Sequence, residues 1–315
     1  MPPWCSHTDE SVGTSIRAVA PQERASRRPD QAVTRPLVSF VVPTVDRRNE
    51  LERLLRSADA QPGEHYELLV VDAGSECVEE VALRHRNVRY LRSPHRGLSR
   101  NRNLAIAHAR GEWLVFADDD CVLAADYLQV LTEQVVPSLD DREFAFGNAV
   151  SLEDGLPLVP TFRPARRPVG SWACDTLCSI SLVLGRQTVE RAGGFDEEFG
   201  LGARFPAGEE TDLLLRLCEA GGRGIYCQAL TVMHPRRSRT RDLVSRYEGY
   251  GYAHGALARK HIHNGPCLVR FAYGLVRAFG GMTLEACRGQ GLAQLHRASL
   301  RGRLRGFRAY AEQHR

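Results

Sequence analysis

The chain has 315 residues, of which 43% are hydrophobic and 25% charged, a composition typical of a globular protein with a sizeable core. Its net charge of +4 is too small to indicate nucleic-acid binding, and no run of about 18 apolar residues predicts a transmembrane helix. The nine cysteines form no paired C-x2-C sets, so we expect no structural zinc site. We expect small buried thiols and a cytoplasmic, reducing environment.

Residues 1–36 are polar and contain several prolines, which predicts a disordered leader and no secretory signal. Beyond them, short apolar runs alternate with amphipathic stretches. Strands are predicted at 37–42, 66–71, 88–91 and 113–116, and helices at 49–60, 78–86 and 98–109. In the first helix, the apolar face is predicted to contain Leu51, Leu54, Leu55 and Ala58. This alternation indicates an α/β fold with a mostly parallel sheet and helices on both faces.

The second half of the chain is less regular. A strand is predicted at 144–150, a proline-rich loop at 151–169, a helix at 212–220 and a strand at 225–233. The chain from residue 242 onward is mainly helical in pattern, and residues 241–315 contain 13 Lys and Arg against 4 Asp and Glu. We therefore divide the chain into a leader at 1–36, an α/β domain at 37–240 and a basic helical C-terminal region at 241–315.

The basic tail allows two interpretations. Leu300, Leu304 and Phe307 fall on one face of its last predicted helix, and arginines occupy the other faces. These helices could simply pack on the α/β domain with their arginines in water. Alternatively, they could attach the protein peripherally to the anionic inner face of a membrane.

An acidic run, Asp118, Asp119 and Asp120, follows directly on the strand predicted at 113–116. Three neighbouring carboxylates repel one another, and a divalent cation at the sheet edge would relieve that repulsion. Carboxylates one residue apart can address two parts of one ligand, so we expect Asp118 and Asp120 to face the ligand and Asp119 to point elsewhere. A solvated acidic turn or a helix cap is the alternative.

Asp72 follows the strand predicted at 66–71 and precedes a short polar turn. Ligands bind beyond the carboxyl ends of the strands in such sheets, so Asp72 is expected at the same edge as the acidic run. Its carboxylate could accept a hydrogen bond from a base or a ribose hydroxyl. A tight turn, which Gly74 and Ser75 allow, is the alternative.

Three further sets of polar residues lie at the ends of predicted elements. Arg102 and Asn103 lie near a helix start, where a cation and an amide suit a phosphate group. Glu209 and Glu210 begin a later helix, and one of them could serve as a general base, although a helix N-terminus favours carboxylates in any case. His234 could add a nitrogen ligand to carboxylates around Mn²⁺ or Mg²⁺, or be an ordinary core or surface histidine.

Taken in order, these segments resemble the family 2 inverting glycosyltransferases of the GT-A fold. The resemblance runs from about Leu37 to Pro235 and rests on motifs that are weak singly but occur in the right order. They are Val38 to Thr44, Leu69-Val70-Val71-Asp72-Ala73-Gly74-Ser75, Gly97 through Arg102-Asn103 to Gly111, Phe116-Ala117-Asp118-Asp119-Asp120, Gly193-Gly194-Phe195-Asp196-Glu197 and Gly208-Glu209-Glu210-Thr211-Asp212-Leu213. The resemblance implies a Rossmann-like, mostly parallel sheet flanked by helices, with a helical C-terminal extension.

The resemblance also implies a role for each site residue. The donor site would comprise Pro43, Thr44, Asp72, Arg102, Asn103, Asp118 and Asp119. Within it, Asp72 would contact the base or ribose of the donor, and Asp118 the ribose. Asp120 and His234 would hold Mn²⁺ or Mg²⁺ at the diphosphate. Glu210 would be the catalytic base, with Glu209 as the alternative.

The reaction implied by the resemblance moves a sugar from a nucleotide-sugar donor to an acceptor hydroxyl, with inversion. UDP is the expected nucleotide, while dTDP and GDP stay open. The acceptor could be a glycan, a lipid-linked glycan or a small molecule.

Three positions depart from the family pattern. Ala73 replaces a usual polar residue, Glu210 replaces an Asp, and Val45-Asp46 stands where an aromatic-Asn pair is common. A nucleotidyltransferase is one alternative function, but the glycines of its phosphate loop are missing from residues 43–48. A non-catalytic nucleotide-sugar-binding protein is the other, and the intact acidic residues argue against it.

Overall fold

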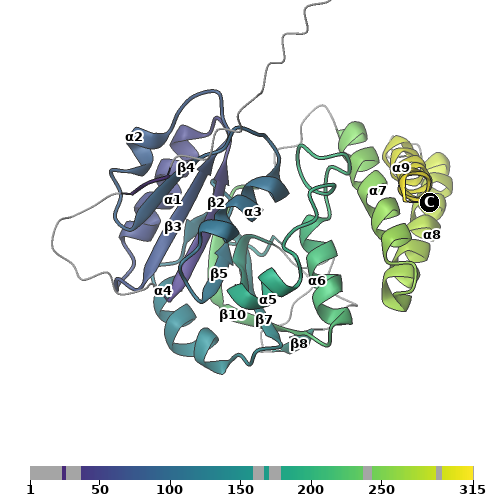
Figure 1. The fold of residues 1–315 in the computed structure, drawn as a ribbon. Coiled ribbons are helices and arrows are strands. Elements are labelled where there is room, and N and C mark those ends of the chain that lie inside the picture. The colour runs from purple at the N-terminus through teal and green to yellow at the C-terminus, as the bar shows by residue number, and fades with distance from the viewer. Residues whose placement is uncertain are drawn as a thin grey trace, which may run out of the picture.

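A computed structural model of the chain describes residues 23–25, 37–158, 167–169, 179–236, 243–288 and 293–314. Its centre is a single mixed sheet with helices on both faces, and three long helices stand to one side (Figure 1). Within these ranges, every helix is too short or too polar to cross a bilayer.

The sheet has ten strands in the order β1-β4-β3-β2-β5-β9-β7-β10-β6, and β8 also pairs with β10. Their bounds are β1 Glu23–Ala25, β2 Val38–Thr44, β3 Tyr66–Asp72, β4 Val88–Arg92, β5 Trp113–Phe116, β6 Val122–Leu123, β7 Glu143–Ser151, β8 Arg167–Val169, β9 Leu182–Gly185 and β10 Arg223–His234. Strands β4, β3, β2 and β5 are parallel to one another, as are β7 and β10, whereas β9 runs antiparallel between β5 and β7. The predicted α/β fold with a mostly parallel sheet is confirmed.

The helices that cover the sheet follow the predicted alternation. They are α1 Arg48–Asp59, α2 Glu79–Ala82, α3 Leu98–His108, α4 Tyr127–Gln129, α5 Arg186–Arg191 and α6 Glu209–Glu219. Helix α4 continues as a π-helix at Val130–Val135 and a 3-10 turn at Val136–Ser138. The buried face of α1 consists of the four residues that its spacing predicts, Leu51, Leu54, Leu55 and Ala58.

The sheet divides the core into two layers because successive side chains of a strand point to opposite faces. Phe40 of β2 packs in the layer that contains α1, while its neighbour Val41 packs in the layer that contains α3 and α6. Every residue of β2 and β3 is buried. Two-sided burial explains why these strands are mostly apolar, and the buried Ser39 and Glu67 within them are hydrogen-bonded to each other.

Several elements differ from the sequence-based prediction. Helix α2 is a single turn, because the segment from Leu83 onward turns back toward β4. The segment expected to be a proline-rich loop contributes β8, which pairs antiparallel with β10. Within the segment expected to be a disordered leader, Glu23–Ala25 pairs with β4, whose outer edge offers free backbone groups. The other residues of that segment lie outside the described part of the chain.

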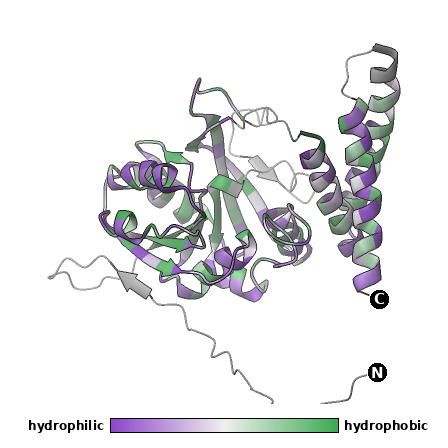
Figure 2. Ribbon diagram, turned by 90° about the horizontal axis from the view of Figure 1, so that it is seen from above, coloured by the Kyte–Doolittle hydropathy of each residue, from purple (hydrophilic) through white to green (hydrophobic). Residues whose placement is uncertain are grey.

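The C-terminal helices α7 Leu243–Lys260, α8 Gly265–Arg288 and α9 Ala293–Gln313 form a layer beyond α6 (Figures 1 and 2). Helices α7 and α9 approach each other closely through glycines: a Cβ atom at Gly306 would lie 1.9 Å from the Tyr252 carbonyl oxygen. Phe199 and Phe205, from the loop that precedes α6, pack against α7 and Tyr310 of α9. The tail therefore rests on the loop that leads into the helix of Glu209 and Glu210.

Candidate active site

The register of the sheet brings its polar strand ends to one edge. Strand β2 pairs with β3 so that Thr44 lies opposite Asp72, and with β5 so that Val41 lies opposite Phe116. Residues 118–120 follow β5 directly. His234, the last residue of β10, reaches the same place because β10 pairs with β6, placing Met233 opposite Val122.

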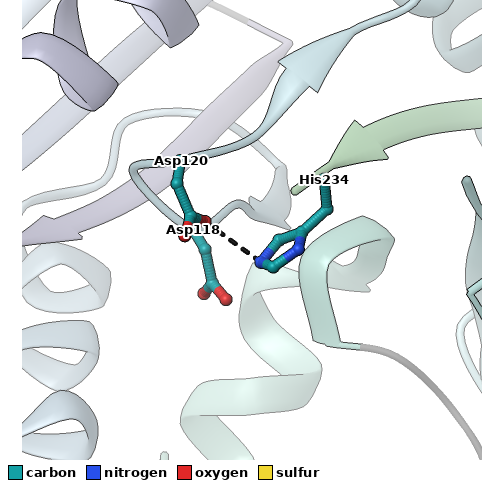
Figure 3. A group of neighbouring side chains, drawn as sticks. All are labelled: Asp118, Asp120 and His234. Carbon is teal, nitrogen blue, oxygen red and sulfur yellow. Dashed lines mark ion pairs between the residues drawn. The ribbon is translucent and has the colours of Figure 1, made fainter. Parts of the chain in front are cut away.

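Asp118, Asp120 and His234 form a cluster at this edge (Figure 3). Each offers one ligand atom, and these atoms lie within 4.8 Å of one another. His234 Nε2 is 3.1 Å from Asp120 Oδ1. Two carboxylates and an imidazole form a donor set that suits Mn²⁺ or Mg²⁺, with water completing the shell.

The protonation of His234 is set by its neighbours. Its Nδ1 lies 2.7 Å from the Pro235 carbonyl oxygen and therefore carries a proton, which directs Nε2 toward Asp120. Burial would lower the pKa of His234, but the hydrogen bond and charge of Asp120 outweigh it and raise the pKa. Burial would likewise raise the pKa of Asp120, but His234 and then Arg47 lower it. Asp120 is therefore an ionised carboxylate at neutral pH.

Asp119 is not part of this cluster. It is buried and accepts a hydrogen bond from the Thr44 hydroxyl at 2.8 Å and another from Arg47 at 3.0 Å. Burial raises the pKa of Asp119 to about 6, although Thr44 and Arg47 both oppose the rise. Asp119 and Thr44 thus tie the acidic run to the end of β2.

Arg47 is a site residue that the sequence analysis missed. Its Nη1 contacts Asp119 Oδ1 at 3.0 Å and Asp120 Oδ2 at 2.9 Å, and half of its side chain is exposed. Arg47 follows Asp46, whose positive φ of 54° turns the loop after β2. The Asp46 carboxylate accepts hydrogen bonds from the backbone amides of Ser75 and Glu76. Arg47 lies three residues beyond the end of β2, close to the acidic run, and this position could have identified it from the sequence.

Arg102 joins the acidic run to the start of α6. Its side chain is 2% exposed, and its Nη1 contacts Glu209 Oε1 at 3.1 Å while Nη2 contacts Asp118 Oδ1 at 3.4 Å. The guanidinium also lies 5.3 Å from the centre of the Phe195 ring. A buried guanidinium needs such partners because its desolvation is costly. Arg102 therefore positions two carboxylates and is itself too buried to approach a donor freely.

Glu209 and Glu210 begin α6 side by side. One carboxylate oxygen of Glu210, Oε2, is buried and has no hydrogen-bond donor among the described residues. Burial raises the pKa of Glu210 to about 8, and the charge of Glu209 adds to the rise. Glu209 is already engaged with Arg102. Of the two, only Glu209 is held by a cation, while Glu210 lies against Glu209 and shares a hydrogen bond with it.

Ion pairs with the C-terminal helices hold α6 in place. Asp212 is fully buried and lies 2.6 Å from Lys260 Nζ and 2.9 Å from His261 Nε2. Lys260, at the end of α7, also contacts Asp196 at 2.6 Å. Burial would raise the pKa of Asp212, but His261, Lys260 and Arg216 lower it to about 2. The helix that carries Glu210 is thus fixed from both sides, by Arg102 and by α7.

Asp72 is engaged within the protein, in the tight turn that the sequence left open as the alternative to a donor contact. Its side chain is fully buried, and its oxygens accept hydrogen bonds from the Gly74 amide at 2.8 Å and the Tyr90 hydroxyl at 2.8 Å. Arg92 Nη1 lies 2.8 Å away as well. Both oxygens of Asp72 are thus engaged within the protein, and its expected contact with the base or ribose stays a prediction.

Asn103 and Pro43 also have structural surroundings. The Asn103 amide donates to the Phe195 carbonyl and accepts from the Phe195 backbone N–H, both at 2.8 Å, which fastens α3 to the loop before α6. Pro43 is buried in β2 opposite Val71. Arg102 thus links the cluster of Asp118, Asp120 and His234 to the start of α6, where Glu209 and Glu210 lie. The other expected donor residues, Pro43, Thr44, Asp72, Asn103 and Asp119, contact protein groups in this structure.

The part of the chain that holds most of this edge matches a known family. Residues 39–139, from β2 through the acidic run, match the family model of glycosyl transferase family 2. The match covers this segment and does not include the C-terminal half of the chain. The resemblance inferred from the motifs is confirmed.

Two curated relatives extend the match beyond that segment. A pre-mycofactocin glycosyltransferase of Mycobacterium tuberculosis is 26% identical over 268 residues, which cover 80% of this chain and 54% of that protein. The O-antigen biosynthesis protein RfbC of Myxococcus xanthus is 29% identical over 70% of this chain and 16% of its own length. The chain thus spans about half the length of the first relative and less of the second.

Solved structures establish the GT-A fold. The mannosyltransferase PcManGT from Pyrobaculum calidifontis, in complex with GDP-Man and Mn²⁺, superposes with a TM-score of 0.62 at 16% identity, covering 87% of this chain and 88% of that one. S. aureus TarS 1-349 in complex with UDP-GlcNAc gives a TM-score of 0.57 at 16% identity, covering 70% and 65%. The expected fold, a GT-A sheet followed by C-terminal helices, is confirmed.

The contacts of Arg47 lead to a prediction about metal affinity. Arg47→Ala removes a cation that competes for Asp120 and Asp119, so we expect Mn²⁺ alone to bind about ten-fold more tightly, the size of one charge-assisted hydrogen bond. Titration followed by the electron paramagnetic resonance of free Mn²⁺ measures this. Arg56→Ala, which removes an equal charge from an exposed pair with Glu52, is the control. Unchanged or weaker Mn²⁺ binding in Arg47→Ala would show that Arg47 does not compete for the site.

Proposed function

We propose that the protein transfers a sugar from a nucleotide-sugar donor to an acceptor hydroxyl, with inversion at the anomeric carbon. The observation that carries the proposal is the bridge made by Arg102 between Asp118 of the acidic cluster and Glu209 of the acidic pair. Asp118 and Asp120 suit a metal ion bound to a diphosphate, and the pair Glu209 and Glu210 can accept a proton. A single displacement needs both functions on adjacent sides of one site.

We propose Mn²⁺ or Mg²⁺ as the cofactor, because the residues at the sheet edge fit such an ion. Asp118, Asp120 and His234 would hold it, and the proton on His234 Nδ1 leaves Nε2 turned toward the cluster. When bound, such a cation stabilises the negative charge of a leaving diphosphate. PcManGT, which shares the fold, was solved with Mn²⁺.

Glu210 is the proposed catalytic base. Its buried Oε2 is not held by a donor, whereas Glu209 contacts Arg102 and Asp212 contacts Lys260 and His261. The Glu210 side chain is only partly buried, and its carboxylate would take the proton of an acceptor hydroxyl as that hydroxyl attacks the anomeric carbon. Glu209 and Arg102 are positioning residues in this scheme.

A UDP-linked sugar is the proposed donor, with dTDP- and GDP-linked sugars as the alternatives to test. The solved structures with this fold hold UDP-GlcNAc and GDP-Man, so the fold accommodates either nucleotide. The acceptor is proposed to be a glycan, a lipid-linked glycan or a small molecule. A thermal-shift screen of nucleotide sugars, with and without Mn²⁺, would identify the donor, and the absence of any shift would contradict the proposal.

We further propose that residues 37–240 are the catalytic domain and that residues 241–315 are a basic helical region packed against it. The ion pairs of Lys260 and His261 with Asp212 support this division. A cytoplasmic location is also proposed, because Cys77, Cys121, Cys218, Cys227 and Cys267 are free thiols, which suits a reducing compartment.

The Glu210→Gln variant tests the assigned base. We expect it to keep donor binding in the thermal-shift assay and to lose transfer about 10²- to 10⁴-fold, the usual contribution of a general base. Glu64→Gln, at an exposed position before β3, is the control and should remain fully active. Full activity of Glu210→Gln together with loss in Glu209→Gln would assign the base to Glu209.

The pKa of Glu210 predicts the pH dependence of the reaction. Only the ionised carboxylate accepts a proton, and burial followed by the charge of Glu209 raises the pKa of Glu210 to about 8. We therefore expect kcat/KM to fall about ten-fold per pH unit on the acidic side of that pKa and to level off above it. Glu209→Gln should move this limb to lower pH. A limb near the ordinary carboxyl pKa of about 4 would contradict the assignment.

A further inference from the structure

One face of α8 is apolar and open to solvent. Val269, Tyr273, Val276 and Phe279 are between 54% and 70% exposed, and their spacing of four, three and three residues places them on one side of the helix. Monomeric soluble proteins seldom expose a contiguous patch of this kind without a partner. The hydropathy view shows α8 and α9 as long helices at the periphery of the molecule (Figure 2).

The exposed face continues as a groove onto α9. The groove is lined by Leu275, Val276, Phe279 and Gly280 of α8 and by Leu300 and Leu304 of α9. The opposite sides of both helices are already used: the Phe271 ring stacks on Phe307, Ala278 is buried, and Gly302 and Gly306 pack on α7. The apolar groove is therefore what remains after the helices have packed on the rest of the protein.

Arginines line the α9 side of this groove. Arg297, Arg301 and Arg308 lie three or four residues from Leu300 or Leu304, so they project from the same side of α9, and all three are exposed. Among the described residues, none of the three forms an ion pair, in contrast with Arg305, which contacts Glu248. Across α8 and α9 the sequence contains eight arginines and two glutamates.

We propose that this surface, made of the exposed face of α8 and the Leu300–Arg308 face of α9, docks the protein on an anionic lipid bilayer. Apolar side chains enter the acyl boundary, and the arginines beside them meet lipid phosphates, as in interfacial amphipathic helices. The charge pattern favours this occupant over a second copy of the chain, because self-association through the groove would place the unpaired arginines of both copies close together.

If α8 and α9 dock on the membrane, the edge of the sheet that carries the candidate active site does not itself need to contact lipid. Asp118, Asp120 and His234 lie at the ends of β5 and β10, and α7 separates α8 and α9 from the helix that carries Glu210 (Figure 1). Membrane attachment and sugar transfer are therefore separable properties. Vesicle binding can be measured whether or not the proposed transfer reaction is correct.

Co-sedimentation of the full chain with vesicles tests the proposal. We expect binding to vesicles of phosphatidylcholine mixed with phosphatidylglycerol, little binding to phosphatidylcholine alone, and weaker binding as salt increases. The triple variant Arg297→Gln, Arg301→Gln and Arg308→Gln should bind about a hundred-fold more weakly, from about five-fold for each arginine near an anionic surface. The double variant Val276→Ser and Phe279→Ser should lose about ten-fold or more, because the apolar area that enters the bilayer is removed.

Two control variants separate this surface from general effects of charge and hydrophobicity. The triple variant Arg56→Gln, Arg84→Gln and Arg191→Gln removes the same charge from other exposed sites, and Leu156→Ser removes an exposed apolar side chain elsewhere. Both should bind vesicles as the unmodified chain does, and thermal melting checks that every variant is folded. Absence of binding to anionic vesicles, or equal binding by all variants, would overturn the proposal. A dimer in solution that Val276→Ser and Phe279→Ser dissociates, without vesicle binding, would assign the groove to a second copy.

Discussion

The site depends on one buried charge. Arg102 is nearly inaccessible, and its guanidinium is balanced by Asp118 from the end of β5 and Glu209 from the start of α6. An unpaired guanidinium in such a place would be strongly destabilising, so the positions of α3, β5 and α6 are coupled through this group. The Phe116 and Phe195 rings beside it exclude water and strengthen both ion pairs. Asp118 at the sheet edge and Glu209 at the start of α6 are thereby held in a fixed relation to each other.

Around Arg102, several carboxylates lie close together, and the repulsion between Glu209 and Glu210 contributes to the raised pKa of Glu210. Arg47 and His234 pair with the acidic run and Thr44 donates a hydrogen bond to it, whereas burial and then the charge of Glu209 raise the pKa of Glu210. A carboxylate with a raised pKa is a stronger base once ionised. The C-terminal helices belong to the same arrangement, because Lys260 and His261 hold Asp212 one turn beyond Glu209.

Much of this could be predicted from the sequence because it follows from local periodicity. The four-residue face of α1 and the strand that leads into Asp118 are encoded by apolar spacing, and parallel strands bring their carboxyl ends together. The contacts of Arg47 and the burial of Asp72 could not be predicted, because both depend on loop geometry: the positive φ at Asp46 turns Arg47 toward the acidic run, and Tyr90 and Arg92 enclose Asp72 from the neighbouring strand. Periodicity carries no information about either contact.

The stereochemistry of the product tests the central claim most directly. With an α-linked nucleotide sugar, Mn²⁺ and an acceptor hydroxyl, a single displacement assisted by Glu210 predicts a β-linked product from the first turnover. Proton NMR of the new anomeric signal, followed from the start of the reaction, distinguishes the two configurations. A β-anomer would support direct attack by the acceptor, and an α-anomer would contradict it.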